Sequence, residues 1–73
     1  MDYRLDEELK DFNEQDLIGQ TLNEAISIAN YNGVTKYRTA REDDVNYMLT
    51  SDLQFNRLNF EIDNKVITKV YFG

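Results

Sequence analysis

The sequence predicts a small α+β domain in which one helix packs on a mixed sheet of about three strands and a long loop is exposed. Three observations predict this fold. A capping box, an apolar face and a following glycine indicate a helix over residues 22–32. Strict alternation indicates a strand over 57–63, and β-branched and aromatic residues indicate strands over 34–40 and 66–72. One helix must cover one face of such a sheet.

Composition limits the chemistry that this chain can carry out. Its 73 residues form one domain at most, and a chain of this size buries only about 60% of its unfolded surface. It has no cysteine and no histidine, so disulfides, a thiolate nucleophile and the usual general base near neutral pH are absent. We therefore expect a protein that is not an enzyme and that holds no metal or cofactor.

The charge of the chain is concentrated at its beginning. Residues 1–16 hold seven acidic and two basic residues, a charge of −5, whereas the other residues hold seven acidic and six basic ones, a charge of −1. We therefore divide the chain into an acidic leader over 1–15 and a single domain over 16–73. Nucleic-acid binding is disfavoured because phosphate contacts need a basic patch. No apolar run follows Met1, so we expect no membrane span and no signal peptide, and a cytoplasmic location; a processed secreted form is the alternative.

The leader allows two interpretations. Leu5, Leu9 and Phe12 stand at positions i, i+4 and i+7, the spacing that lines one face of a short helix. Residues 1–15 are therefore either a docked helical turn or a mobile leader. Residues 17–19 are expected to be extended, and Gly19 marks a bend before the helix.

The helix has a start signal and a stop signal. In the capping box, the Thr21 hydroxyl accepts a hydrogen bond from the Glu24 amide, and the Glu24 carboxylate accepts one from the Thr21 amide. Gly33 ends the helix in the left-handed conformation that glycine adopts most easily. The apolar face comprises Leu22, Ala25, Ile26 and Ala29.

The strands follow in the second half of the chain. After the 34–40 strand, the charged run over 41–44 is a breaker. In the 57–63 strand, Leu58, Phe60 and Ile62 point one way, as in a half-buried strand. The polar residues that point the other way are Arg57, Asn59, Glu61 and Asp63. A tight turn over 63–65, with Asn64 at positive φ, joins this strand to the last one in an antiparallel hairpin.

The irregular segment over 42–56 is the candidate functional loop. A loop of about fifteen residues is unusual in so small a domain and suggests function, and its length allows the flanking strands to lie parallel. Within it, residues 50–52 are either a solvated turn or a partner contact. Tyr47, Met48 and Leu49 are either core residues or an exposed anchor for a partner. The acidic residues 42–44 lack the spacing of a calcium loop, so we expect a solvated turn there.

Several short motifs resemble one known family over residues 16–73. The helix contains Ala25 and is preceded by Leu17-Ile18-Gly19. The second half contains Leu49-Thr50-Ser51-Asp52, Asn56-Arg57-Leu58, Ile62-Asp63 and a terminal Gly73. This order is similar to that of the potato inhibitor I family of serine protease inhibitors and its bacterial relatives.

The resemblance implies a substrate-like inhibitor whose extended loop is held in the conformation that a protease binds. Ser51 then occupies the specificity position, Thr50 precedes it, and Asp52 follows the scissile bond. The residues that would contact a protease or another protein partner are Met48, Leu49, Thr50, Ser51, Asp52, Leu53 and Gln54.

The resemblance also implies how the loop is stabilised. Arg57 would donate to Thr50 or Asp52 and to the carboxylate of Gly73; the alternative is an outward Arg57 paired with Glu61. Charge-assisted bonds of this kind fix a loop, so that little entropy is lost on binding. Many family members have a second arginine where this chain has Asn59, and another arginine position holds Gln54.

Two functional hypotheses follow. The first is a binding protein that acts through the 42–56 loop, most concretely as a serine protease inhibitor. The alternative is an acidic inhibitor of another intracellular enzyme, such as one that handles nucleic acid, on the same fold. An exposed edge strand over 34–40 or 66–72 would allow two copies to pair, so we expect a monomer or a weak dimer.

Overall fold

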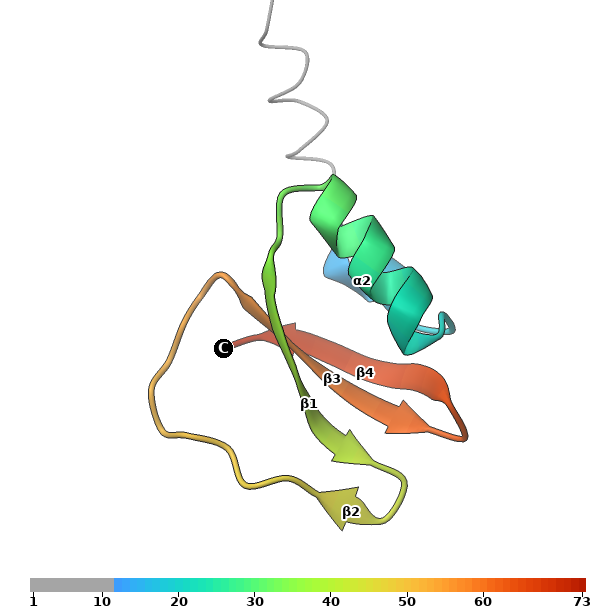
Figure 1. The fold of residues 1–73 in the computed structure, drawn as a ribbon, viewed down its shortest axis with the longest axis vertical. Helices are drawn as coiled ribbons and strands as arrows, with labels where there is room; N and C mark the ends of the chain where they lie inside the picture. The colour runs from blue at the N-terminus through green and yellow to red at the C-terminus, as the bar shows by residue number, and fades with distance from the viewer. Residues whose placement is uncertain (1–11) are drawn as a thin grey trace, which may run out of the picture.

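The computed structural model describes residues 12–73, which form one helix packed on a small mixed four-stranded sheet (Figure 1). The α+β fold is therefore confirmed, with one strand more than the three expected. The elements are the 3-10 helix η1 (Glu14–Leu17), α2 (Leu22–Tyr31), β1 (Lys36–Glu42), β2 (Val45–Asn46), β3 (Arg57–Asp63) and β4 (Val66–Phe72). The strand order is β2-β1-β3-β4. β1 and β3 are parallel, and the other two pairs are antiparallel.

Helix α2 has both predicted end signals. The Glu24 amide donates to Thr21 Oγ1 at 3.3 Å, and the Thr21 amide donates to Glu24 Oε1 at 2.9 Å. At the other end Gly33 has a φ of 87°, and the Val34 amide donates back to the Ala29 carbonyl at 2.9 Å. This glycine-containing cap satisfies carbonyls that the helix leaves without partners. The predicted helix is thus confirmed.

The segment before α2 is less extended than expected. Leu17 is the last residue of η1 and is fully buried, so the expectation of an extended Leu17 is wrong. The turn is docked on the sheet because Gln15 Nε2 donates to the Val70 carbonyl at 3.2 Å. Gly19 has a φ of 94°, which fits the predicted bend, and its amide donates to the Ile67 carbonyl at 2.8 Å.

The two interpretations of the leader concern mostly residues 1–11. Leu5 and Leu9 lie outside the described residues. Phe12 is partly buried and packs against the core.

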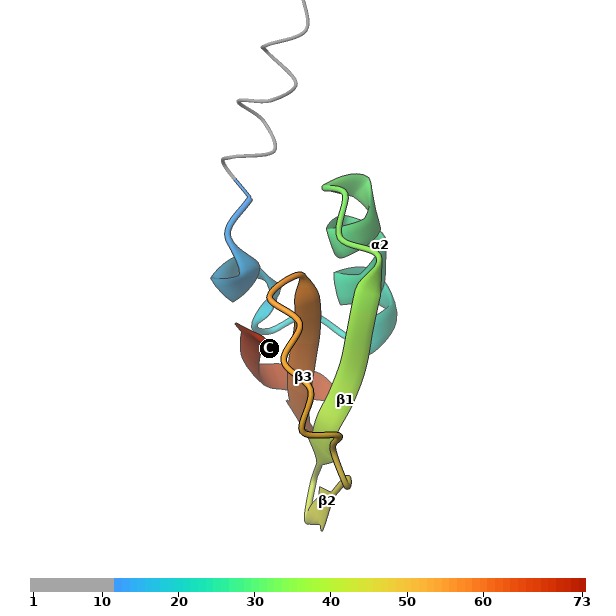
Figure 2. The same ribbon diagram turned by 90° about the vertical axis from the view of Figure 1, so that its left-hand side faces the viewer.

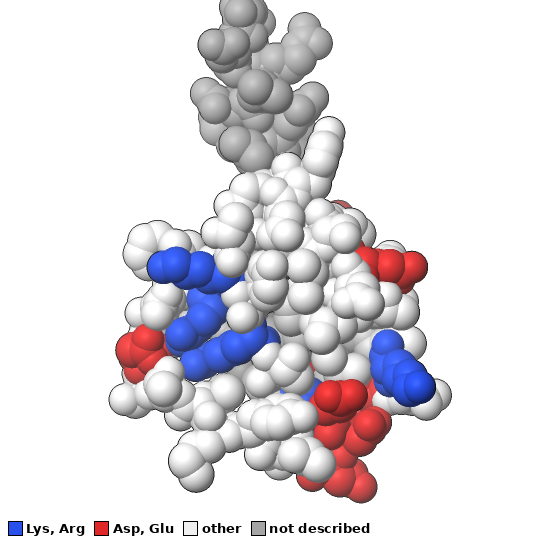
Figure 3. All heavy atoms as spheres, viewed as in Figure 1, with Lys and Arg blue, Asp and Glu red and all other residues white. Residues whose placement is uncertain are grey.

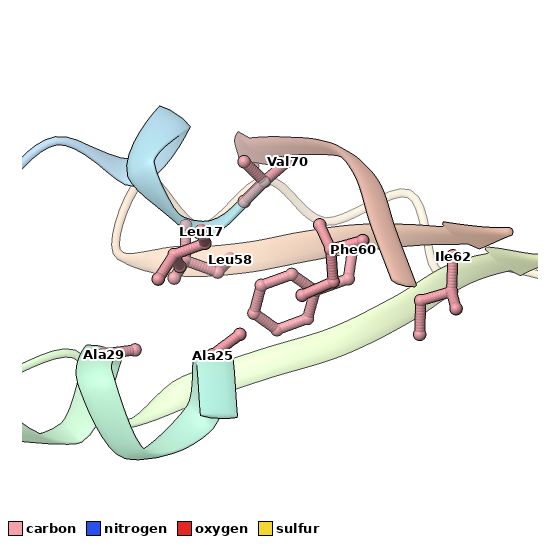
Figure 4. Close-up of a cluster of buried hydrophobic side chains, with 8 residues drawn as sticks. Leu17, Ala25, Ala29, Leu58, Phe60, Ile62 and Val70 are labelled. Carbon is pink, nitrogen blue, oxygen red and sulfur yellow. The ribbon is translucent and has the colours of Figure 1, made fainter. Parts of the chain in front are cut away.

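The hydrophobic core lies between α2 and the sheet (Figure 4). Its buried members are Leu17, Ala25, Ala29, Leu58, Phe60, Ile62, Ile67 and Val70. The ring of Phe60 projects from β3 toward Ala25, and two alanines on α2 allow the helix to approach the sheet closely. The inward side of β3 is therefore confirmed. On α2, Leu22 is only partly buried and packs against this core, and Ile26 is half-buried.

The bounds of β1 differ from the predicted strand. β1 starts two residues later than predicted, at Lys36, and continues to Glu42. The prediction that residues 41–44 break the strand is therefore wrong for residues 41 and 42. The reversal is confined to Asp43 and Asp44, and Asp43 has a φ of 53°. Directly after it, the two-residue β2 pairs with β1, which shortens the irregular segment from 42–56 to 47–56.

Arg41 explains why the charged run continues the strand. Its guanidinium donates to both carboxylate oxygens of Asp63 at 2.7 Å, to Glu61 Oε1 at 3.1 Å and to the Asp43 carbonyl at 2.7 Å. Hydrogen bonds from Arg41, and then from the Thr68 hydroxyl, hold the pKa of Asp63 well below its usual range. The bonds from Arg41 to Glu61 and Asp63 join β1 to β3, so these ion pairs stabilise the sheet at the end of β1.

The hairpin between β3 and β4 is confirmed. Asn64 and Lys65 have φ values of 54° and 69°, the pair of positive angles that a two-residue type I′ turn requires. The outer face of β3 is not wholly solvated as expected, because Asn59 is fully buried.

Candidate functional site

The 47–56 loop connects β2 to β3 and lies on the side of the sheet away from α2 (Figures 1 and 2). Its two ends are fixed to the strands by backbone hydrogen bonds. The Tyr47 amide donates to the Ala40 carbonyl at 3.0 Å, and the Arg57 amide donates to the Gln54 carbonyl at 3.0 Å. The residues between these anchors have no regular secondary structure.

Large apolar side chains of the loop are exposed. The exposed fractions are 100% for Met48, 87% for Leu53 and 90% for Phe55. Tyr47 and Leu49 are also exposed, at 47% and 38%. The interpretation of residues 47–49 as core residues is therefore wrong, and the alternative of an exposed apolar segment describes them.

Arg57 contacts the loop from the first position of β3. Its Nη2 donates to the Asp52 carbonyl at 2.9 Å, and its Nε donates to the backbone oxygen of Gly73 at 2.9 Å. Its Nη1 also lies 3.6 Å from Asp52 Oδ2. Glu61, the alternative partner, pairs instead with Arg41 and Lys69. Of the two arrangements expected for Arg57, the structure therefore has the one that stabilises the loop.

Arg38 is a second loop contact, which the sequence analysis missed. From β1, its Nη1 donates to Thr50 Oγ1 at 3.2 Å, and its Nε donates to Asn59 Oδ1. Arg38 lies beside Asn59 in the parallel β1–β3 register. The alternation of Lys36 and Arg38 along the predicted strand was the available signal. This alternation identifies the partner of Arg38 only when the register between β1 and β3 is known.

Asn59 connects Arg38 to the end of β4. While its Oδ1 accepts from Arg38, its Nδ2 donates to the backbone oxygen of Gly73 at 2.9 Å and to the Tyr71 carbonyl at 3.3 Å. The β3 position two residues after Arg57 thus holds a buried amide. The second guanidinium that reaches the loop, that of Arg38, comes from the neighbouring strand β1.

The polar loop residues also bond to one another. The Thr50 hydroxyl donates to Asp52 Oδ1, and Gln54 Nε2 donates to Asp52 Oδ2 at 2.9 Å. Lys36 Nζ donates to Gln54 Oε1 at 3.3 Å. The hydrogen bonds from Thr50 and Gln54, aided by the charge of Arg57, lower the pKa of Asp52 from 3.8 to about 2. Figure 3 shows basic side chains gathered on the side of the molecule where Figure 1 places the loop.

Among residues 12–73, no group of three or more acidic, histidine or cysteine residues could hold a metal ion. No helix within the same residues is long and apolar enough to cross a membrane. An open hollow of about 390 Å³ lies between the start of α2 and the β3–β4 turn, and no residue of the 47–56 loop lines it.

Comparisons with known proteins do not assign the chain. No protein-family model matches it, and no curated protein gives a significant match. The candidate site is therefore defined by its own geometry: an exposed loop whose Thr50 and Asp52 are held by arginines from β1 and β3.

Proposed function

We propose that this protein binds a protein partner through the 47–56 loop and is, most concretely, a substrate-like inhibitor of a serine protease. The arrangement around Ser51 carries this proposal. Ser51 is exposed, the Thr50 side chain before it accepts from Arg38, and the Asp52 backbone after it accepts from Arg57. Charge-assisted bonds are stronger than neutral ones. A loop fixed before binding loses little entropy when it enters a substrate cleft.

The same contacts suggest why cleavage would be slow. A serine protease attacks the carbonyl carbon of the residue in its specificity pocket and releases an amine from the following residue. Here the Ser51–Asp52 bond would break and leave a new amine on Asp52. Arg57 contacts both the carbonyl and the carboxylate of Asp52, so the amine would stay beside the acyl-enzyme and re-form the peptide bond in competition with hydrolysis.

The test is a titration of subtilisin-like and chymotrypsin-like proteases at nanomolar enzyme concentration. Wild type and Ser51→Leu are compared, and inhibition by either one is the expected result. Arg57→Met should bind more weakly and be cleaved faster, because Asp52 then loses its strand contact. If neither wild type nor Ser51→Leu inhibits any of these enzymes, the protease-inhibitor proposal fails.

The charge distribution favours a second candidate, an acidic inhibitor of another enzyme that acts through the leader. Residues 1–16 carry −5 of the total charge of −6, and such a segment suits a basic groove. Deletion of residues 1–11 tests this candidate and leaves the contacts of Phe12 and Gln15 in place. Loss of partner binding on deletion would support the leader, whereas full retention would support the loop.

A further inference from the structure

The side chains of residues 50–54 divide into two sets that alternate along the chain. The even-numbered residues bond to basic residues of the sheet: Thr50 to Arg38, Asp52 to Arg57 and Gln54 to Lys36. Ser51 and Leu53 lie between them and are exposed.

The exposed residues around this segment differ in size. Leu49, Leu53 and Phe55 are large and apolar, whereas Ser51, between Leu49 and Leu53, is small and polar. Leu53 and Phe55 are 87% and 90% exposed. Six of the ten exposed large hydrophobic residues within 12–73 lie between residues 45 and 55. Such a concentration of exposed apolar side chains marks an interaction surface.

We propose that the partner is an elastase-like serine endopeptidase, with a small central specificity pocket flanked by apolar subsites. This inference rests on the proposed inhibitor function and specifies its target class. The size and charge of the central pocket select the residue that a serine protease accepts: an acidic pocket selects basic residues, a deep apolar slot aromatic ones, and a small pocket small ones. Ser51 fits the small pocket, whereas it would leave a deep slot unfilled.

The flanking residues strengthen this choice. Leu49 and Leu53 stand two positions before and two after Ser51, and both are exposed, at 38% and 87%. An extended cleft would therefore receive the small residue centrally and an apolar residue on each side. Burial of apolar surface is the main favourable term in most protein–protein association, so the two leucines compensate for the small contact area of Ser51.

The experiment measures inhibition constants against three serine proteases that differ in the central pocket: pancreatic elastase, chymotrypsin and trypsin. Wild type should inhibit elastase at least tenfold more tightly than the other two. Ser51→Ala should keep this order, because alanine also fits a small pocket. Ser51→Leu should weaken elastase inhibition at least tenfold and strengthen chymotrypsin inhibition. Leu53→Ala should weaken elastase inhibition about tenfold. Ser27→Leu, at an exposed position of α2, is the matched control and should change nothing.

The outcomes separate this inference from the proposed function. If wild type inhibits chymotrypsin or trypsin more tightly than elastase, the elastase-like assignment is overturned while the loop inhibitor stands. The same holds if Ser51→Leu leaves the order of the three constants unchanged. If neither wild type nor Ser51→Leu inhibits any of the three enzymes or a subtilisin, both proposals are overturned.

Discussion

Replacement of Asn59 by alanine tests the buried contact beneath the loop. The Asn59 side chain is fully buried and takes part in three hydrogen bonds. Its Oδ1 accepts from Arg38 Nε, and its Nδ2 donates to the backbone oxygens of Gly73 and Tyr71 at 2.9 and 3.3 Å. Alanine removes all three bonds and leaves the half-buried Arg38 without this acceptor.

The magnitude follows from the kind of bonds that are lost. A hydrogen bond to a charged group contributes about 1.5–3 kcal/mol, and a neutral one about 0.5–1.5 kcal/mol. Because the two neutral bonds share one amide group, we take about 1 kcal/mol for them together, which gives a loss of about 3 kcal/mol in the free energy of unfolding. Such a loss lowers the melting temperature of a domain of this size by roughly 12–24 °C.

The assay is urea unfolding followed by far-ultraviolet circular dichroism, which gives the free energy of unfolding of each variant. Asn23→Ala is the matched control, because Asn23 is exposed on α2, and a surface substitution of this kind changes stability by no more than about 0.5 kcal/mol. A loss below about 1 kcal/mol for Asn59→Ala would refute the conclusion that this amide stabilises the sheet beneath the loop.

Three further predictions concern the loop and the helix. Arg38→Met should speed thermolysin cleavage within the loop about tenfold, the factor that corresponds to a loss of 1.4 kcal/mol, because Thr50 loses its strand contact; mass spectrometry of the fragments measures it. Thr21→Ala should lower the free energy of unfolding by about 1 kcal/mol, because the Glu24 amide loses its cap; urea unfolding measures it. The Asp52 carboxyl should titrate near pH 2 rather than 3.8, as measured by carbon-13 NMR. Since its folded pKa is lowered, its stabilising effect is present above about pH 4 and is lost as the pH falls from about 4 through 2.

Each of these predictions has a control or a contradicting result. Lys69→Met removes an exposed cation on β4 and should leave the cleavage rate unchanged; equal rates for the Arg38 and Lys69 variants would contradict the role of Arg38. Ser27→Ala, in the middle of α2, should not reproduce the loss caused by Thr21→Ala. An Asp52 midpoint at or above 3.8 would show that Thr50 and Gln54 do not donate to this carboxylate in solution.

Elements with local sequence signals were predicted well. The cap at Thr21 and the glycine at Gly33 depend on bonds within a few residues, so the sequence alone locates α2. The alternation through Leu58 and Phe60 likewise reflects a property of one strand. β2 was missed because a two-residue strand has no pattern of its own and exists only through pairing with β1.

The candidate site was predicted only in part, for a related reason. Arg57 was identified through the family resemblance. Its contact to Asp52 joins two residues that are only five positions apart in the sequence. Arg38 lies 21 residues before Asn59, and their contact depends on the parallel register. The sequence allowed this register but did not specify it. The burial of Asn59 could not be predicted either, since it requires the loop and Gly73 to cover the outer face of β3.

The loop conformation and the core packing both depend on the register of β1 and β3. In that register Tyr37 lies beside Leu58, and Arg38 lies beside Asn59. Tyr37 packs against the core, and the next side chain in a strand points to the opposite face, where Arg38 reaches the loop. A slip of one residue would exchange these faces and place the arginine toward α2. Apolar packing on the helix side therefore determines where the guanidinium lies on the loop side, so a core substitution that loosens the β1–β3 pairing should also release Thr50.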